Sequence, residues 1–211
     1  MPRGTQLILA SFLSLTVGTS VPLPYQKSSQ TSGQQTFRSP DGTSQFTYAS
    51  SYTLYAGSEA EQPALSYIPV CQSAVACVVY PRSRYVGTNF QAAAFQEREI
   101  DEATTENACL TSPMRAPNVP EFYTCIKDPT RIINGVKFLH GSSFSFGTGN
   151  YMNTDLYRNF HKSRCYELSI NVATSAFWAF DPGAVKEFTP KDEQRVRNEL
   201  TIVLDSFRFL K

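Results

Sequence analysis

The sequence is poor in the residues and motifs from which most metal and catalytic sites are built. Its 211 residues include only two histidines, His140 and His161, and no Cys-x-x-Cys or His-Glu-x-x-His motif. A zinc site needs several such ligands at short, fixed spacings, so we expect no metal. The nucleophile motif Gly-x-Ser-x-Gly is missing, and no lysine directly follows the glycine-rich stretch 147–149, which argues against a phosphate-binding loop. The sequence therefore predicts no catalytic residue and no cofactor.

An excess of charge of one sign is also missing. The chain has 19 Lys plus Arg and 18 Asp plus Glu, and no basic block. Proteins that bind nucleic acid concentrate positive charge where the phosphate backbone lies. We therefore expect no nucleic-acid partner.

Long apolar runs are absent after the first twenty residues. Within those twenty, Arg3 precedes the mostly apolar run Leu7–Val17, and the small residues Gly18 and Ser20 stand before a cleavage point at Val21. This layout is typical of a secretory signal peptide, and the run is about half the length that a membrane helix needs. We expect residues 1–20 to be a cleaved signal, with an uncleaved anchor as the alternative. The sequence then predicts a secreted or periplasmic protein with no transmembrane segment after cleavage.

The remaining chain divides into a short polar segment and one domain. Residues 21–36 are rich in Ser, Gln, Thr and Pro and hold almost nothing apolar after Tyr25, so we expect a flexible tether. Residues 37–211 contain no internal repeat and no stretch that reads as an interdomain linker. Their length suits a single α+β domain with one core.

Strand patterns dominate that domain. Phe46 and Tyr48 alternate with polar residues after the turn sequence 39–42, and Asn134-Gly135 between two apolar runs predicts a tight β-hairpin. The segment 93–100 fits an edge strand by its alternating pattern and a helix by its Ala and Glu content. We expect a strand there that runs into a short helix over 101–110. Further strands are expected at residues 77–80, 130–133, 136–139, 156–160 and 165–172.

The C-terminal end predicts one amphipathic helix. Thr189 is a good N-cap, Pro190 fits the first helical position, and Asp192 lies where a carboxylate favours the helix dipole. One apolar stripe at a period of 3.6 residues follows, formed by Val196, Leu200, Val203, Leu204 and Phe207. The helix should lie on the sheet, and residues 206–209 should leave it and run along a sheet edge.

The two ends of the domain resemble a known family. Ser39–Tyr55 and Leu200–Phe209 look like the ends of the PsbP-like α/β/α sandwich, through their aromatic and hydrophobic patterning. The resemblance implies a mostly antiparallel sheet flanked by helices. Members of this group serve as extrinsic subunits of photosystem II, as a binder of the small GTPase Ran, or as secreted bacterial domains. The resemblance favours binding over catalysis and carries no functional residue onto this chain.

Five cysteines in an exported chain predict disulfides. Two bonds among five cysteines can form in 15 ways, which sequence alone cannot distinguish. We favour local bonds between Cys71 and Cys77 and between Cys109 and Cys125, with Cys165 as a free thiol in a buried strand. Other pairings stay open.

A catalytic interpretation of Cys165 is the alternative. Cys165 lies four residues after His161, with Asp155 and Glu167 nearby, and a thiol beside an imidazole can act as a nucleophile. In a hairpin over 156–172, however, His161 falls in an exposed turn while Cys165 falls inside a strand. We therefore expect a core cysteine and a solvated histidine.

The sequence thus favours an exported binding or accessory module for a protein or a small apolar ligand. The expected contact residues are Tyr151, Tyr157, Arg158 and His161, although Tyr157 suits the core equally well. The alternative is a secreted hydrolase whose acid and base groups come together only in three dimensions.

Overall fold

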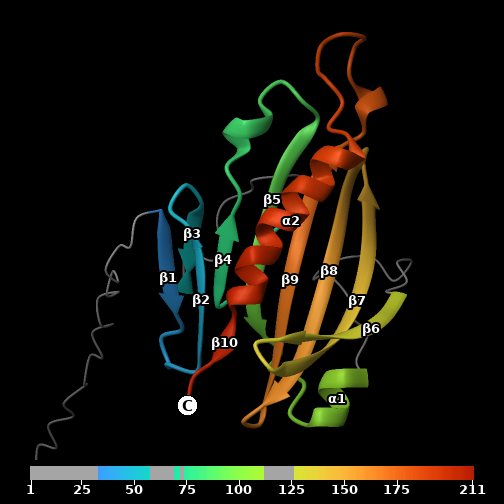
Figure 1. The fold of residues 1–211 in the computed structure, drawn as a ribbon. Coiled ribbons are helices and arrows are strands. Elements are labelled where there is room, and N and C mark those ends of the chain that lie inside the picture. Colours follow the sequence, from blue (N-terminus) through green and yellow to red (C-terminus); the bar gives the residue numbers. More distant parts are fainter. Residues whose placement is uncertain (1–32, 58–68, 72–73, 112–125) are drawn as a thin grey trace, which may run out of the picture.

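The computed structural model describes residues 33–57, 69–71, 74–111 and 126–211, and these form two antiparallel sheets and two α-helices (Figure 1). The small sheet has the order β1-β2-β10, and the large sheet has the order β3-β4-β5-β9-β8-β7-β6. The strands are β1 (Gln34–Arg38), β2 (Ser44–Ala49), β3 (Thr53–Ala56), β4 (Ala76–Val79), β5 (Phe90–Glu99), β6 (Ile126–Ile133), β7 (Val136–Gly147), β8 (Asn150–His161), β9 (Arg164–Ser175) and β10 (Arg208–Phe209). The helices are α1 (Glu106–Thr111) and α2 (Pro190–Ser206), with 3-10 turns η2 (Arg82–Tyr85) and η3 (Phe177–Ala179). This is the predicted α+β class.

The predicted C-terminal helix is α2, and it lies across one face of the large sheet (Figure 1). Thr189 caps it as expected: the Asp192 N–H donates to Thr189 Oγ1, and the Thr189 N–H donates to Asp192 Oδ2. The predicted stripe is buried against aromatic and aliphatic side chains of the sheet. After Phe207 the chain leaves the helix, and β10 pairs with the edge of β2, as the sequence predicted.

Local turn chemistry gives the hairpins. Asn134 and Gly135 both have positive φ, 45° and 80°, as a type I′ turn between β6 and β7 requires. The ambiguous segment 93–100 lies almost entirely in β5, and the helix expected over 101–110 is shorter and begins at Glu106. Most of the expected tether lies outside the described residues. Its end differs from the prediction, because Gln34 already begins β1.

The two disulfides correct the predicted pairing. Cys71 bonds to Cys77, as expected, whereas Cys109 bonds to Cys165, so Cys165 is not a free thiol. The reason is tertiary: the side chain of Cys165 points to the face of the large sheet away from α2, and α1 lies against that face beside β8. Cys125, the expected partner of Cys109, lies outside the described residues.

A buried carboxyl group joins the two sheets. Ser44 of β2 donates to Glu97 Oε1 of β5 at 2.5 Å, and Glu97 is 1% exposed. Its Oε2 is buried and has no hydrogen-bond partner among the residues that the structure describes. Burial, with smaller contributions from the negative charges of Glu99 and Asp41, raises the pKa of Glu97 to about 7, although the Ser44 hydrogen bond opposes the shift. The folded protein therefore holds this proton more tightly than the unfolded chain does.

The raised pKa predicts that stability falls as the pH rises. The stabilisation from Glu97 is complete below its ordinary pKa of about 4.5 and is lost as the pH rises through about 7. Glu97→Gln is expected to leave the free energy of unfolding near its original value at pH 4.5 and to raise it by about 3 kcal/mol at pH 8. Urea denaturation at both pH values measures this.

The exposed Glu187 provides the control for that measurement. Glu187→Gln should leave the pH dependence unchanged. A Glu97→Gln variant with the same pH dependence as the original protein would contradict the assignment of the bound proton to Glu97.

Candidate functional site: an exposed aromatic end

The four expected contact residues all lie on β8, but they do not form one surface. Tyr157 and Arg158 are buried, at 3% and 2% exposure. Tyr151 and His161 are half-buried and lie near opposite ends of this twelve-residue strand. Because neighbouring residues of a strand point to opposite faces, Arg158 points away from the other three. Tyr151 is the member that joins an exposed cluster, described below.

Arg158 belongs to a buried ion cluster on the face away from α2. Its Nε donates to Glu167 Oε2 at 2.6 Å, and Arg98 Nε donates to Glu167 Oε1 at 2.6 Å. The three side chains come from β8, β9 and β5, which are neighbours in the sheet. Glu167 is 1% exposed. This arrangement holds three strands together, and we assign it a structural role.

Tyr157 belongs to a second polar cluster, between the sheet and α2. The ring of His140 stacks on the ring of Tyr157 at 4.5 Å, and His140 Nε2 lies 3.8 Å from Asp155 Oδ1. Arg197 of α2 donates to Asp155 Oδ2. Burial alone would raise the pKa of Asp155, but the nearby His140 ring and the charge of Arg197 lower it below its ordinary value. Sequence reasoning missed this cluster, because only the strand register brings His140 and Asp155 together.

His161 is not in the solvated turn that the sequence predicted. It is the last residue of β8, and its ring stacks on Phe209 with 4.0 Å between ring centroids. Burial and the nearby Lys162 lower the pKa of His161, so its neutral form is favoured. Cys165 is in a disulfide, which removes the thiol from the supposed Cys165–His161 pair.

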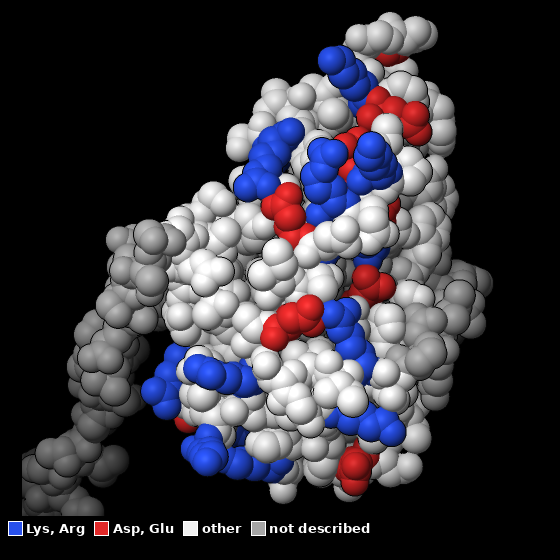
Figure 2. All heavy atoms as spheres, in the orientation of Figure 1, with Lys and Arg blue, Asp and Glu red and all other residues white. Residues whose placement is uncertain are grey.

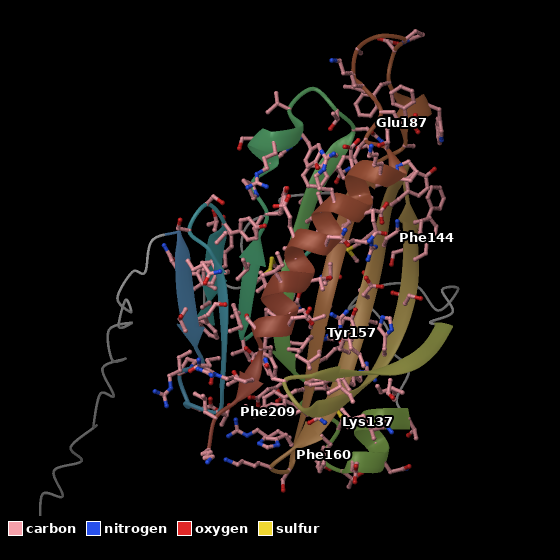
Figure 3. The ribbon with its side chains drawn as sticks, viewed as in Figure 1. Lys137, Phe144, Tyr157, Phe160, Glu187 and Phe209 are labelled. Carbon is pink, nitrogen blue, oxygen red and sulfur yellow. A yellow bond between two sulfur atoms is a disulfide. The ribbon has the colours of Figure 1, made fainter. Side chains whose placement is uncertain are left out.

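The exposed surface that stands out is aromatic and lies at one end of the molecule. Five of the seven large hydrophobic side chains exposed in the described ranges gather there: Val86 (81% exposed), Phe144 (45%), Phe146 (44%), Phe177 (43%) and Trp178 (75%). We call these five residues the aromatic end. Phe144 and Glu187 mark it in Figure 3, whereas Phe160 and Phe209 lie at the opposite end. Trp178 is the only tryptophan of the chain.

Backbone hydrogen bonds hold the segments of the aromatic end side by side. The Ala176 N–H donates to the Gly149 carbonyl at 2.6 Å, which fixes η3 beside the β7–β8 turn. The Lys186 N–H donates to the Gly87 carbonyl at 2.8 Å, and the Asn89 N–H donates to the Lys186 carbonyl at 3.2 Å. The loop from η3 to α2 is thereby tied to the loop that follows η2.

Aromatic stacking extends the aromatic end onto the sheet. The ring of Tyr151 stacks on the rings of Phe144 and Phe146, with centroids 5.7 and 5.1 Å apart. Phe144, Phe146 and Tyr151 share the sheet face that α2 covers further along. Tyr151, one of the four candidate contact residues, therefore adds to this surface.

Charges of both signs surround the aromatic end. Residues 177–180 carry no charge. The nearby exposed side chains are two acids, Asp181 and Glu187, and four bases, Arg82, Arg84, Lys186 and Lys191, of which Arg84 is paired with Glu199. In Figure 2, Lys and Arg alternate with Asp and Glu around this end of α2. No group of three or more His, Cys, Asp or Glu placed to hold a metal ion occurs in the described ranges. Among the same residues, no helix is long and apolar enough to cross a membrane.

Comparison with known proteins gives only distant structural likenesses. No family model and no curated protein matches the chain. LpqN of Mycobacterium tuberculosis, described as involved in cell envelope biogenesis, is similar over 84% of this chain and 91% of its own, at 9% identity and a TM-score of 0.46. A Bacteroides thetaiotaomicron protein matches 83% of this chain and 48% of its own, at 10% identity and a TM-score of 0.40.

Cyanobacterial PsbP (CyanoP) from Synechocystis sp. PCC 6803 is also similar, over 90% of this chain and 99% of its own, at 10% identity and a TM-score of 0.42. The solved structures similar to the chain therefore include a protein of the family that its two ends resemble. Likenesses this distant carry no argument about function, which has to come from the chain's own surface.

Proposed function

We propose that this chain is an exported binding module that contacts its partner through the aromatic end. Export is supported by the N-terminal leader pattern and by two disulfides, because such bonds persist in oxidising compartments. The partner presents an apolar surface, since residues 177–180 at the aromatic end carry no charge.

The observation that carries the proposal is the exposure of Trp178. A tryptophan side chain removes a large apolar area from water when it is buried, and most tryptophans in folded proteins are largely buried. Here the only tryptophan is 75% exposed and has an exposed phenylalanine beside it. Exposed apolar clusters of this kind mark interaction sites, and tryptophan is among the residues that contribute most to binding energy.

The hydrolase alternative has less support among the described residues. Cys165 is bonded to Cys109, and Asp155, the carboxylate beside His140, is held by Arg197. A general base must be free to take a proton from substrate, whereas Asp155 is kept ionised in a contact that ties α2 to the sheet.

Site-specific photocrosslinking tests the proposal. A benzoylphenylalanine replaces Trp178 in one variant and Ile202, a 63%-exposed residue of α2, in the other. Both variants are expressed in the native host and irradiated, and mass spectrometry then detects protein or lipid adducts on the labelled peptide. We expect adducts at position 178 and few at position 202. Equal labelling of the two positions, or none at 178, would overturn the proposal.

A further inference from the structure

We infer that the aromatic end docks on the interface of an electrically neutral phospholipid bilayer. The inference rests on the proposed function and names the partner. Its first support is shape: the loop between η3 and α2 extends beyond the ends of the strands, and η2 lies at the same end (Figure 1). Val86, Phe177 and Trp178 are therefore on projecting segments, which suit a soft surface that they can enter, while Phe144 and Phe146 lie near the end of β7.

The second support is the chemistry of η3 and of the loop that follows it. η3 and the next residue, 177–180, read Phe-Trp-Ala-Phe, and an exposed turn over 181–184 follows. Tryptophan and tyrosine concentrate at the boundary between lipid headgroups and acyl chains, because their rings are apolar with one polar group. Trp178, Tyr151 and the neighbouring phenylalanines provide such a set on three adjacent segments.

The third support is rigidity. The loop that carries Trp178 is bonded at one end to the β7–β8 turn and at the other to the segment after η2. Within it, the Ala184 N–H donates to the Asp181 carbonyl at 2.9 Å, and Gly183 has the positive φ of 82° that this turn uses. A loop that is already ordered loses little conformational entropy when its side chains enter the interface.

Charge decides the kind of lipid. Binding to anionic lipid depends on clusters of Lys and Arg near the surface. At the aromatic end, Lys186 and Arg82 are offset by Asp181 and Glu187, Arg84 is paired with Glu199, and Lys191 is followed by Asp192 and Glu193 in the first turn of α2. The apolar side chains therefore provide the attraction, and binding to a neutral, zwitterionic surface should depend little on salt.

Vesicles of pure phosphatidylcholine provide the test. The protein used is the whole chain that remains after signal cleavage, residues 21–211. Trp178 is the only tryptophan, so the emission spectrum reports on this loop alone. We expect the protein to sediment with the vesicles and its emission to shift to shorter wavelength. Phe177→Ser and Trp178→Ser should each lower the partition coefficient of the protein into the vesicles about tenfold, because each removes a large apolar side chain from the contact.

Ile202→Ser is the matched control, since Ile202 is apolar, has an exposed fraction between those of Phe177 and Trp178, and lies on α2. It should bind vesicles as the original protein does, and circular dichroism should show all three variants folded. Absence of sedimentation, or equal loss in Ile202→Ser, would overturn the inference. So would binding that requires anionic lipid and disappears in salt. Protein adducts at position 178 without vesicle binding would leave the proposed function standing and remove the bilayer as the partner.

Discussion

Replacing Glu167 with alanine is expected to lower the free energy of unfolding by about 3 to 5 kcal/mol. The carboxylate receives guanidinium groups from Arg98 and Arg158, and both side chains are mostly shielded from water, at 14% and 3% exposure. Removal of the carboxylate takes the negative charge out of a buried cluster with two positive charges. The Arg98 and Arg158 guanidinium groups are then left shielded from water without a negative partner. This lowers the free energy of unfolding by more than the small net stabilisation that the intact ion pairs provide.

Asp205→Ala provides the control for the Glu167 prediction. Asp205 pairs with Arg131 at 2.6 Å, but the two side chains are 51% and 33% exposed. An exposed pair of this kind contributes about 1 kcal/mol or less. Urea denaturation compares the two variants, and a smaller loss in Glu167→Ala than in Asp205→Ala would contradict the structural role of the cluster.

Removing the bond between Cys109 and Cys165 is expected to lower the free energy of unfolding by about as much as Glu167→Ala does. The bond spans 56 residues, and closing a loop of this length in the unfolded chain corresponds to about 4 kcal/mol in the chain-entropy treatment. The double variant Cys109→Ala with Cys165→Ala should therefore lose about that much stability. The equivalent change at Cys71 and Cys77, which are only 6 residues apart, should cost about 2 kcal/mol.

Denaturation without reductant measures this difference, and the reverse order would contradict the assigned bonds. Labelling of free thiols in the denatured, unreduced protein is an independent check. With four of the five cysteines in bonds, the label should be found on Cys125. Label on Cys165 would restore the pairing that sequence spacing suggested.

The elements that sequence predicts well are those that local chemistry determines. Asn134 and Gly135 take the positive φ of a type I′ turn wherever the flanking strands lie, and Thr189 with Asp192 caps a helix with few demands on the rest of the fold. The apolar stripe of α2 likewise follows from its own spacing. These features need no knowledge of distant segments.

The disulfide and the polar clusters could not be predicted in this way, because they depend on strand order. Cys109 meets Cys165 only after α1 is placed beside β8, and His140 meets Asp155 only once the register of β7 on β8 is fixed. Closeness in sequence favours disulfides that close short loops, so it predicted a bond between Cys109 and the nearer Cys125. His140 lies opposite Tyr157, so a shift of two residues that placed it opposite Asn159 would separate the His140 and Asp155 side chains.

The aromatic end was missed for a different reason. An apolar stretch such as Phe177–Phe180 directly after a strand suggests burial, because apolar side chains are usually inside. The structure places this stretch beyond the last residue of β9, where no element covers Trp178 among the described residues. Exposure depends on where the sheet ends, and a single sequence does not contain that information.

Quenching of Trp178 fluorescence by vesicles with brominated acyl chains shows whether the aromatic end enters the bilayer, because bromine quenches only a tryptophan that it approaches closely. We expect brominated phosphatidylcholine to lower the emission of Trp178, while unbrominated vesicles shift the emission without quenching it. Protein that sediments with both kinds of vesicle but keeps its full emission would rule out docking through the aromatic end, since another surface would then make the contact.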